Sequence, residues 1–221
     1  ADGGVFPATP DFVKSIPVDK ARDEHTMIAF EMNGKPLPAA NGFPARLIVP
    51  GWTGTYWMKQ LTDLDIRTKP QGGFWMNPAC RVPAGRFPHA DAFATQATPA
   101  NTPITDIVVN SLVTSIHDGE RVRRGQTVEV AGIAWDGGRG IREVQVSTDA
   151  GRSWQPAKLG RDYGPYSFRQ YSYRFRPEKE GVHLVMVKAT NARGDTQTMN
   201  LVHNPAGYHH NVVERIQVEV V

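Results

Sequence analysis

The second half of the chain alternates apolar and polar residues with a period of two. The alternation runs through 127–133, 142–147 and 171–176, and it continues through 182–187 and 213–221. Because successive side chains of a strand point to opposite faces, each of these segments has one face that can be buried. About six or seven short strands in roughly 115 residues are typical of an antiparallel sandwich with Ig-like architecture.

Turn residues separate these predicted strands, at 136–138, 149–151 and 192–195. The stretch 137–140, Gly-Gly-Arg-Gly, has the composition of a backbone nest that binds an anion. A plain turn is the better interpretation, because glycine most often serves to supply a positive φ at a hairpin tip.

The first half carries mixed signals. Residues 26–32 and 47–49 predict strands, and Asn33-Gly34 after the first of them predicts a hairpin turn, since both residues tolerate positive φ. Residues 11–16 are compatible with a short helix or a turn. Residues 56–61 predict a short helix with Trp57, Met58 and Leu61 on one face. A stretch rich in Pro, Ala and Thr at 84–106 predicts an extended connector.

Composition restricts the class of protein. Hydrophobic residues make up 40% and charged residues 21%, which is typical of a globular chain, and 21 Gly with 17 Pro argue against a helix bundle. The net charge of +3 is too small for nucleic acid binding, and the apolar runs are too short to span a membrane. A single Cys excludes an internal disulfide. The start, Ala1-Asp2-Gly3-Gly4, lacks the regions of a signal peptide, so we expect a mature or truncated end.

Three places carry candidate chemistry. Gly42 and Gly51 indicate close approach of the backbone to another group, and the cations Arg46 and Lys59 flank this segment as an anion site requires, although both could be solvated. Cys80 stands beside a cation, so a thiolate and a small buried hydrophobe both remain open. The pair at 209–210, His-His, could ligate a metal from a loop, but a solvated pair is the better interpretation.

Six runs of residues resemble the sulfite oxidase family of molybdenum enzymes. Three resemble the later part of its molybdopterin domain: Asn-Gly-Lys-Pro-Leu-Pro at 33–38, the run from Asn41 to Trp52, and Trp-Met-Lys at 57–59. Three resemble the Ig-like dimerisation domain that follows it: 132–138, 146–154, and Asn-Pro-x-Gly-Tyr at 204–208 with Asn211. The resemblance implies a mixed fold, with part of an α+β molybdopterin domain in 1–95 and an Ig-like β-sandwich in 96–221.

The resemblance also implies a function. Family members oxidise sulfite to sulfate at molybdenum held by a pyranopterin, and the sequence is most similar to periplasmic bacterial sulfite dehydrogenases, which pass electrons to a cytochrome c. We therefore expect a periplasmic enzyme that forms a homodimer or pairs with a cytochrome, with neither nucleic acid nor membrane as a partner. The positions that match pterin contacts are Asp2, Asn41, Arg46, Trp57, Met58 and Lys59.

Three departures from the family pattern change the expected site. The metal-ligating Cys of the family lies in an earlier Cys-x-Gly-Asn type motif that this sequence lacks, so the ligand is expected in a missing N-terminal catalytic segment. Cys80 occupies the position of an active-site Tyr. His210 or His209 replaces an anion-binding Arg that relatives carry at Ala206. We expect Trp75, Cys80 and His210 to line the sulfite pocket.

Other functions remain open. The chain could be a non-catalytic Ig-like interaction module, or part of a molybdoenzyme that acts on a different oxyanion or sulfur substrate. Carbohydrate binding through Trp135, Trp154 and Tyr171 is a weaker hypothesis, because these aromatic residues fall at strand positions where core packing is the more common use.

Overall fold

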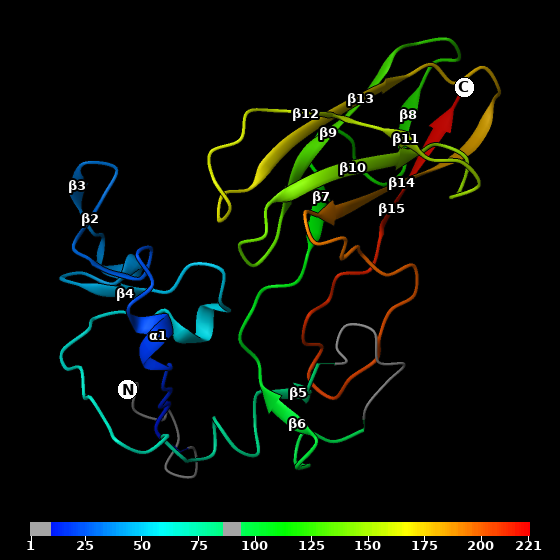
Figure 1. Ribbon diagram of the computed structural model, residues 1–221. Coiled ribbons are helices and arrows are strands. Elements are labelled where there is room, and N and C mark those ends of the chain that lie inside the picture. The colour runs from blue at the N-terminus through cyan, green and yellow to red at the C-terminus, as the bar shows by residue number, and fades with distance from the viewer. Residues whose placement is uncertain (1–9, 86–93) are drawn as a thin grey trace. The chain divides into compact units, whose positions relative to one another are not determined.

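The chain divides into two units by its contacts in the computed structural model, which describes residues 10–85 and 94–221. The first unit contains the described residues up to 106 together with 203–208, and the second contains 107–202 and 209–221. Figure 1 shows the elements of both. In the described ranges, no helix is long and apolar enough to cross a membrane. The division into sequence domains at residues 95 and 96 stays a prediction.

The second unit is a β-sandwich of two sheets (Figure 1). The strands of the larger sheet are β8 (Glu120–Val122), β10 (Ile141–Ser147), β11 (Gln155–Pro156), β14 (Gly181–Asn191) and β15 (Glu214–Val220). Those of the smaller sheet are β7 (Asn110–Val113), β9 (Val128–Trp135), β12 (Lys158–Leu159) and β13 (Arg169–Phe175). Their orders are β11-β10-β14-β15-β8 and β12-β13-β9-β7. All neighbours are antiparallel except β15 and β8, which are parallel.

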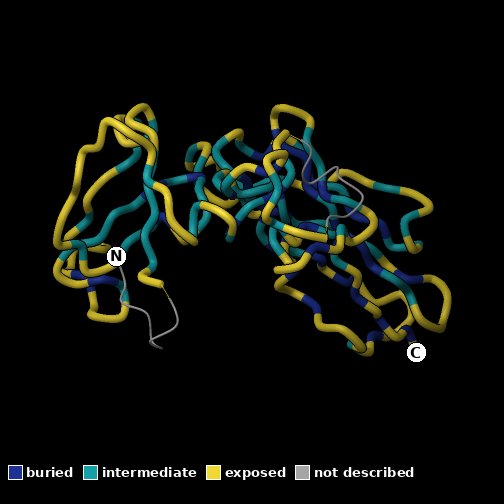
Figure 2. Tube along the Cα trace, turned by 90° about the horizontal axis from the view of Figure 1, so that it is seen from below, coloured by how far each residue is buried: buried dark blue, intermediate teal, exposed yellow. Residues whose placement is uncertain are grey.

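The alternation in the sequence produces the core of this sandwich. Along β9 buried residues alternate with more exposed ones, so Val128, Val130 and Ala134 face inward. Inward residues of both sheets join one hydrophobic cluster that includes Val144, Val187 and others. Figure 2 shows these buried stretches in dark blue along the sandwich strands. The five strands predicted from the period of two are confirmed, and β7, β8, β11 and β12 are additional short strands.

Gly132 makes room for a buried tyrosine in this core. A Cβ at Gly132 would lie 2.0 Å from the carbonyl oxygen of Leu112 and 2.6 Å from the hydroxyl of Tyr171. The Tyr171 hydroxyl donates to that same carbonyl at 3.1 Å, and burial raises the pKa of Tyr171 well above its ordinary value. Because Tyr171 is only 3% exposed, it cannot stack on a sugar, and the carbohydrate hypothesis loses one of its aromatic residues.

The glycine-rich turn at 137–140 is occupied by the protein itself. The buried carboxylate of Asp136 accepts hydrogen bonds from the backbone N–H groups of Gly138, Arg139 and Gly140 at 3.0 to 3.1 Å. These donors are therefore already satisfied by a side chain of the same turn. The interpretation of this segment as a turn is confirmed, and the nest is not open to an external anion.

Glu214 of β15 makes the stability of the sandwich depend on pH. Burial raises its pKa above the ordinary value of 4.5, and a hydrogen bond from the Val113 N–H at 2.7 Å partly opposes that rise. The folded protein then holds this proton more tightly than the unfolded chain does. We therefore expect the free energy of unfolding to fall as pH rises from 4.5 through the raised pKa.

Substitution of Glu214 by Gln tests this expectation. Glu214→Gln keeps an acceptor for Val113 and removes the titrating proton, so the fall in stability as pH rises from 4.5 through the raised pKa should become shallower than in the wild type. Urea unfolding followed by circular dichroism measures the difference. Parallel pH profiles for the two proteins would show that Glu214 does not carry this dependence.

The first unit has short elements and a smaller buried core, mostly teal and yellow in Figure 2. Its helix and 3₁₀ turns are α1 (Val18–Ala21), η1 (Ala39–Asn41) and η2 (Gly54–Tyr56). Its strands are β1 (Met27–Ala29), β2 (Glu31–Met32), β3 (Lys35–Pro36), β4 (Arg46–Ile48), β5 (Arg81–Pro83) and β6 (Asn101–Pro103). The pairs are β1 with β4, β2 with β3, and β5 with β6, all antiparallel.

The hairpin turn predicted at Asn33-Gly34 is confirmed. It joins β2 to β3, and both residues have positive φ, 55° and 72°. The strand predicted at 26–32 is present as the two strands β1 and β2 with a break at Phe30. Of the extended connector predicted at 84–106, residues 86–93 lie outside the described residues, and the end forms β6, which pairs with β5.

Two helix predictions in this unit are wrong. Residues 11–16 form no helix, since Pro17 disfavours helical backbone in the residue before it and α1 begins only at Val18. Residues 57–61 follow η2 as irregular chain beside β4 instead of a helix, with a left-handed φ of 45° at Gln60. The Leu47 N–H donates to the Met58 carbonyl at 2.8 Å, and the Leu61 N–H donates to the Ala45 carbonyl at 2.8 Å. These bonds to β4 replace the ones a helix would have made.

Candidate functional site

A tight turn brings the predicted cations Arg46 and Lys59 together. The turn is η1, which ends at Gly42 with a left-handed φ of 112°. A Cβ on Gly42 would lie 3.0 Å from the Cβ of Arg46 and 3.1 Å from the Cβ of Lys59, so the backbone touches the stems of both cations. Gly42 is therefore required for this packing, as the sequence indicated.

The carbonyl oxygens of the same turn orient the two cations. Arg46 Nη1 donates to the Asn41 carbonyl at 2.9 Å, and Lys59 Nζ donates to the Ala40 carbonyl at 2.6 Å. Arg46 Nε is buried and has no hydrogen-bond partner among the described residues. The turn thus gathers two positive charges and leaves a buried donor unsatisfied. This arrangement suits an anionic group.

Trp57 and Met58 lie in the irregular segment that flanks the turn. Trp57 Nε1 donates to the Val49 carbonyl at 2.7 Å, and the Arg46 guanidinium lies 5.9 Å from the Trp57 ring centroid. Met58 contributes its carbonyl to β4. The structure therefore brings Asn41, Arg46, Trp57, Met58 and Lys59 into one neighbourhood. We name these five residues with Gly42 the cationic turn.

A second cluster forms around the buried thiol of Cys80. Cys80 is 8% exposed and has a left-handed φ of 56°, which is strained for a residue with a side chain. Desolvation lowers the pKa of Lys14, and the charge of Cys80 and a hydrogen bond between the two side chains oppose that shift. Lys14 Nζ also donates to the Trp75 carbonyl at 2.5 Å. Lys14 therefore links two of the predicted site residues, Trp75 and Cys80.

Two tyrosines complete this cluster. Burial raises the pKa of Tyr56 to about 12, and the charge of Cys80 adds to the rise. Burial also raises the pKa of Tyr208, whose hydroxyl is hydrogen-bonded to Cys80 and to Gln96. Tyr208 belongs to the segment 203–208 that returns from the second unit to the first. We name Lys14, Tyr56, Cys80 and Tyr208 the thiol cluster.

The sequence suggested a different cation beside the thiol. The Arg81 guanidinium donates to the carbonyls of Met76 and Asn101, and the cation bonded to the Cys80 thiol is Lys14. Lys14 and Tyr56 had no signal in the sequence, because nothing in the local pattern links positions so far apart. Tyr208 stands in one of the family-like runs, which gave it no chemical role.

The structure leaves the predicted roles of two site residues untested. Asp2 lies outside the described residues. His210 belongs to the second unit, where its carbonyl accepts from Asn110 Nδ2 at 3.0 Å, so its place in a sulfite pocket stays a prediction. Residues 10–85 and 94–221 contain no group of three or more His, Cys, Asp or Glu side chains that could hold a metal ion.

A shallow hollow of about 370 Å³ lies on the sandwich and contains none of the predicted site residues. Its lining residues, all from the second unit, are Glu129, Pro156, Lys158, Ser172, Tyr173 and Arg174. Two of these lining residues, Glu129 and Arg174, form an exposed ion pair at 3.1 Å. The charges of this hollow are thus paired with each other, so we place the candidate site in the first unit.

Matches to known protein families agree with the placement of the candidate site in the first unit. Residues 2–75 match the oxidoreductase molybdopterin binding domain, and residues 101–221 match the Mo-co oxidoreductase dimerisation domain. The first match contains the whole cationic turn, and it also contains Lys14, Tyr56 and Trp75. Cys80 lies just beyond its end.

Individual relatives give the same family. The chain is 37% identical over 148 residues to mitochondrial sulfite oxidase of Homo sapiens, covering 66% of this chain and 26% of that protein. It is 31% identical over 217 residues to mitochondrial sulfite oxidase of Rattus norvegicus, covering 94% of this chain and 39% of that protein. The chain therefore spans well under half the length of these curated relatives.

A solved structure supports the fold. The crystal structure of the sulfane dehydrogenase SoxCD from Paracoccus pantotrophus matches with a TM-score of 0.73 at 22% sequence identity. The match covers 92% of this chain and 51% of that chain. The fold predicted from the sequence, part of a molybdopterin domain followed by an Ig-like sandwich, is confirmed.

Proposed function

We propose a function from one premise: this chain belongs to the sulfite oxidase family of molybdenum enzymes. We infer that it forms the later part of a molybdopterin-dependent oxidoreductase that oxidises sulfite to sulfate. The observation that carries the proposal is the cationic turn, where Arg46 and Lys59 meet on one backbone bend inside the molybdopterin binding match. An assay of sulfite-dependent reduction of cytochrome c by the whole protein tests the proposal. A rate of cytochrome c reduction that does not change when sulfite is added would reject it.

The cationic turn fits a phosphorylated pterin. Arg46 Nε is a buried donor without a partner among the described residues, and the side-chain amide of Asn41 lies on the same turn. A buried unsatisfied donor is costly, and a phosphate oxygen is a partner that removes this cost. Arg46 and Lys59 would hold the anionic end of the pterin, while Trp57 and Met58 pack the turn from the side.

The bound pterin would supply molybdenum, at which an oxygen atom is transferred and two electrons are collected. The residues of this chain would bind and orient the pterin through its charge, and the thiol cluster would face the substrate side. In this proposal the ligand Cys of the metal and the remaining pterin contacts come from the missing N-terminal segment.

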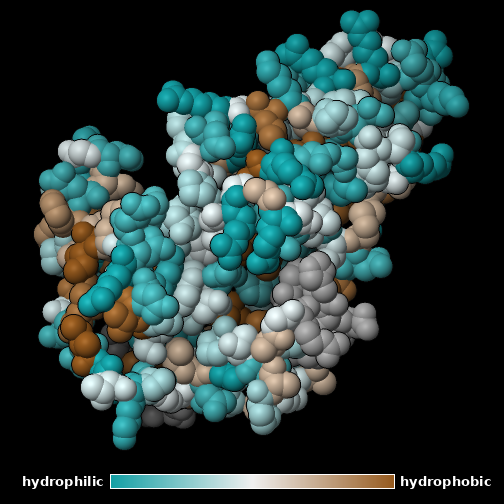
Figure 3. Space-filling view, in the orientation of Figure 1, coloured by the Kyte–Doolittle hydropathy of each residue, from teal (hydrophilic) through white to brown (hydrophobic). Residues whose placement is uncertain are grey.

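Exposed apolar side chains in the first unit support a missing partner segment. Strand β1 and its neighbours expose large hydrophobic residues, and Phe30 is 66% exposed. Brown atoms gather over this unit in Figure 3. The exposed set is Met27, Ile28, Phe30, Met32 and Phe43. We propose that the earlier part of the molybdopterin domain covers this face, since a soluble domain rarely leaves so much apolar surface in water.

The remaining assignments extend the proposal. A cytochrome c is the proposed electron acceptor, the periplasm is the proposed compartment, and the sandwich matched by the dimerisation domain is the proposed contact between two copies.

A different sulfur substrate or oxyanion is the second candidate function, and the thiol at the usual Tyr position favours it. Comparison of rates with sulfite, thiosulfate and nitrite on the whole protein decides between the two.

Substitution of Cys80 tests its match to the family tyrosine. In the whole enzyme, Cys80→Tyr should raise kcat/KM for sulfite, because a phenol reaches further than a thiol and donates a stronger hydrogen bond. Cys80→Ser, which preserves the size of the side chain, is the control and should leave kcat/KM within about threefold. A fall in kcat/KM for Cys80→Tyr would count against the positional match.

A further inference from the structure

The thiol cluster contains a half-buried cation whose described surroundings include no carboxylate partner. In the described part of the chain, Lys14 forms no ion pair with a carboxylate. Its ammonium group is enclosed by aromatic rings, with Nζ 5.3 Å from the Tyr56 ring centroid and 5.8 Å from the Phe12 ring centroid. Rings and one carbonyl stabilise an ammonium group only in part, so a buried positive charge here favours an anion as its partner.

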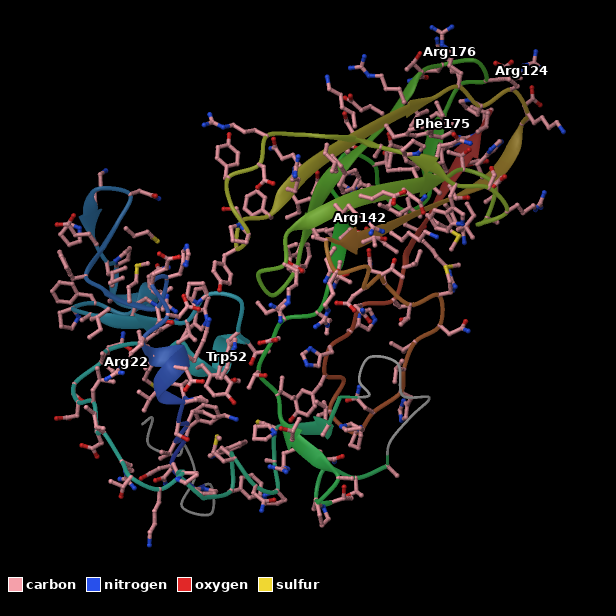
Figure 4. The ribbon with its side chains drawn as sticks, in the orientation of Figure 1. Arg22, Trp52, Arg124, Arg142, Phe175 and Arg176 are labelled. Atoms are coloured by element: carbon pink, nitrogen blue, oxygen red, sulfur yellow. The ribbon has the colours of Figure 1, made fainter. Side chains whose placement is uncertain are left out.

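A second group in the same cluster, the Tyr56 hydroxyl, has no hydrogen-bond partner in the part of the chain that the structure describes. Tyr56 is 2% exposed, and its hydroxyl has no hydrogen-bond partner among the described residues. The Tyr56 ring is fixed by Trp52, which Figure 4 labels, through an edge-on contact with centroids 4.9 Å apart. The ring therefore holds its hydroxyl in one place. Buried hydroxyl groups without partners are uncommon in folded proteins and point to a missing ligand.

Lys14 and Tyr56 both lie next to Cys80. Its side chain is hydrogen-bonded to Lys14, and its charge is felt by the hydroxyl of Tyr56. The three residues come from distant parts of the first unit: the segment before α1, the end of η2, and the turn before β5. Their meeting point thus offers an ammonium donor, a phenol donor and a thiol in surroundings shielded from water. These are the requirements of a small oxyanion.

We propose that Lys14 and Tyr56 form a binding site for a small oxyanion, with Cys80 at its edge. Lys14 supplies the charge that compensates the anion, and the Tyr56 hydroxyl donates to one of its oxygens. The identification of this anion as the substrate or product of the enzyme rests on the proposed function. The binding of an oxyanion does not rest on it.

Titration of the whole protein with inorganic sulfate by isothermal calorimetry, at constant ionic strength in chloride, tests the site. Lys14→Met should weaken sulfate binding by about tenfold or more, because a charge-assisted hydrogen bond is lost. Tyr56→Phe removes only a hydroxyl that has no protein partner, so it should fold normally and weaken binding by about threefold to tenfold. Lys14→Arg, which keeps the charge, should retain most of the affinity.

Lys20→Met is the matched control. Lys20 also lies near an aromatic ring, with Nζ 5.9 Å from the Trp52 ring centroid, but it is paired with Asp23 at 2.9 Å. Sulfate affinity should be unchanged in this variant. Equal affinity for sulfate in the wild type, Lys14→Met and Tyr56→Phe would overturn the proposal, as would an absence of binding by the wild type.

The outcome separates this site from the proposed function. If the whole protein binds sulfate through Lys14 but does not oxidise sulfite, the oxyanion site stands and only its identification with the substrate fails. If the protein oxidises sulfite while Lys14→Met leaves both sulfate affinity and KM for sulfite unchanged, the site is wrong and the proposed function stands.

Discussion

Arg46→Ala should lower the molybdenum content of the whole enzyme by about tenfold or more. The guanidinium group lies on the cationic turn, holds the Asn41 carbonyl at 2.9 Å and leaves Nε without a partner among the described residues. Removal of the side chain deletes both the charge that would meet the pterin phosphate and the bond that shapes the turn. Metal analysis of the purified protein by mass spectrometry measures the loss.

Arg67→Ala is the matched control for this experiment. Arg67 is an exposed arginine that contacts Asp65 at 3.6 Å and Gln71 at 2.6 Å, all outside the cationic turn. Its removal should leave the molybdenum content unchanged. Full molybdenum occupancy in Arg46→Ala would reject the assignment of Arg46 to the cofactor.

Gly132→Ala should destabilise the sandwich strongly, although it adds only one methyl group. The added Cβ would lie 2.0 Å from the Leu112 carbonyl and 2.6 Å from the Tyr171 hydroxyl. The carbonyl belongs to the backbone of β7, so the strand itself must move, and the hydrogen bond between Tyr171 and Leu112 is disturbed with it. We expect a loss of about 3 kcal/mol in the free energy of unfolding and a Tm lower by roughly 10 °C.

Gly72→Ala makes the same chemical change at an open position. A Cβ there meets no other atom within 4 Å, and the residue has no left-handed φ. Its Tm should therefore stay within about 2 °C of the wild type. Scanning calorimetry compares the two variants. If Gly132→Ala is as stable as Gly72→Ala, then β7, β9 and Tyr171 do not pack as closely around residue 132 as the structure shows.

Some of the fold could be predicted from the sequence because local pattern and tertiary environment agree. In β9 and β15 every second residue is inward and apolar, so the period of two records the core directly. The short strands β11 and β12 have two residues each and carry no period of their own. Their backbone pairs only because β10 and β13 lie beside them, which the local sequence does not record.

The helix predicted at 56–61 is wrong because contacts with a segment distant in sequence override the local pattern. Trp57, Met58 and Leu61 have helical spacing, but the backbone of this segment bonds to β4 instead of to itself. A hydrogen-bonding neighbour decided the local structure, and that neighbour is distant in sequence.

Only one part of the candidate site, the cationic turn, could be predicted from the sequence, because its residues on the turn are close together in the chain. Asn41, Gly42 and Arg46 are close in sequence, and glycine beside cations already indicated a bend around an anion. The thiol cluster could not be predicted, because Lys14, Tyr56 and Tyr208 reach Cys80 from three separate segments, and Tyr208 belongs to a segment between the sandwich strands β14 and β15. Only folding makes Lys14, instead of Arg81, the cation at the thiol.

The molybdenum stoichiometry of the native protein tests whether this chain is part of a molybdopterin-dependent oxidoreductase. The protein would be purified from its source with whatever polypeptide accompanies it, and metal content and polypeptide masses would be measured on the same sample. We expect close to one molybdenum atom per copy of this chain, together with sequence that carries a metal-ligating cysteine. A homogeneous protein without molybdenum or pterin, at full folding and after growth with ample molybdate, would contradict it.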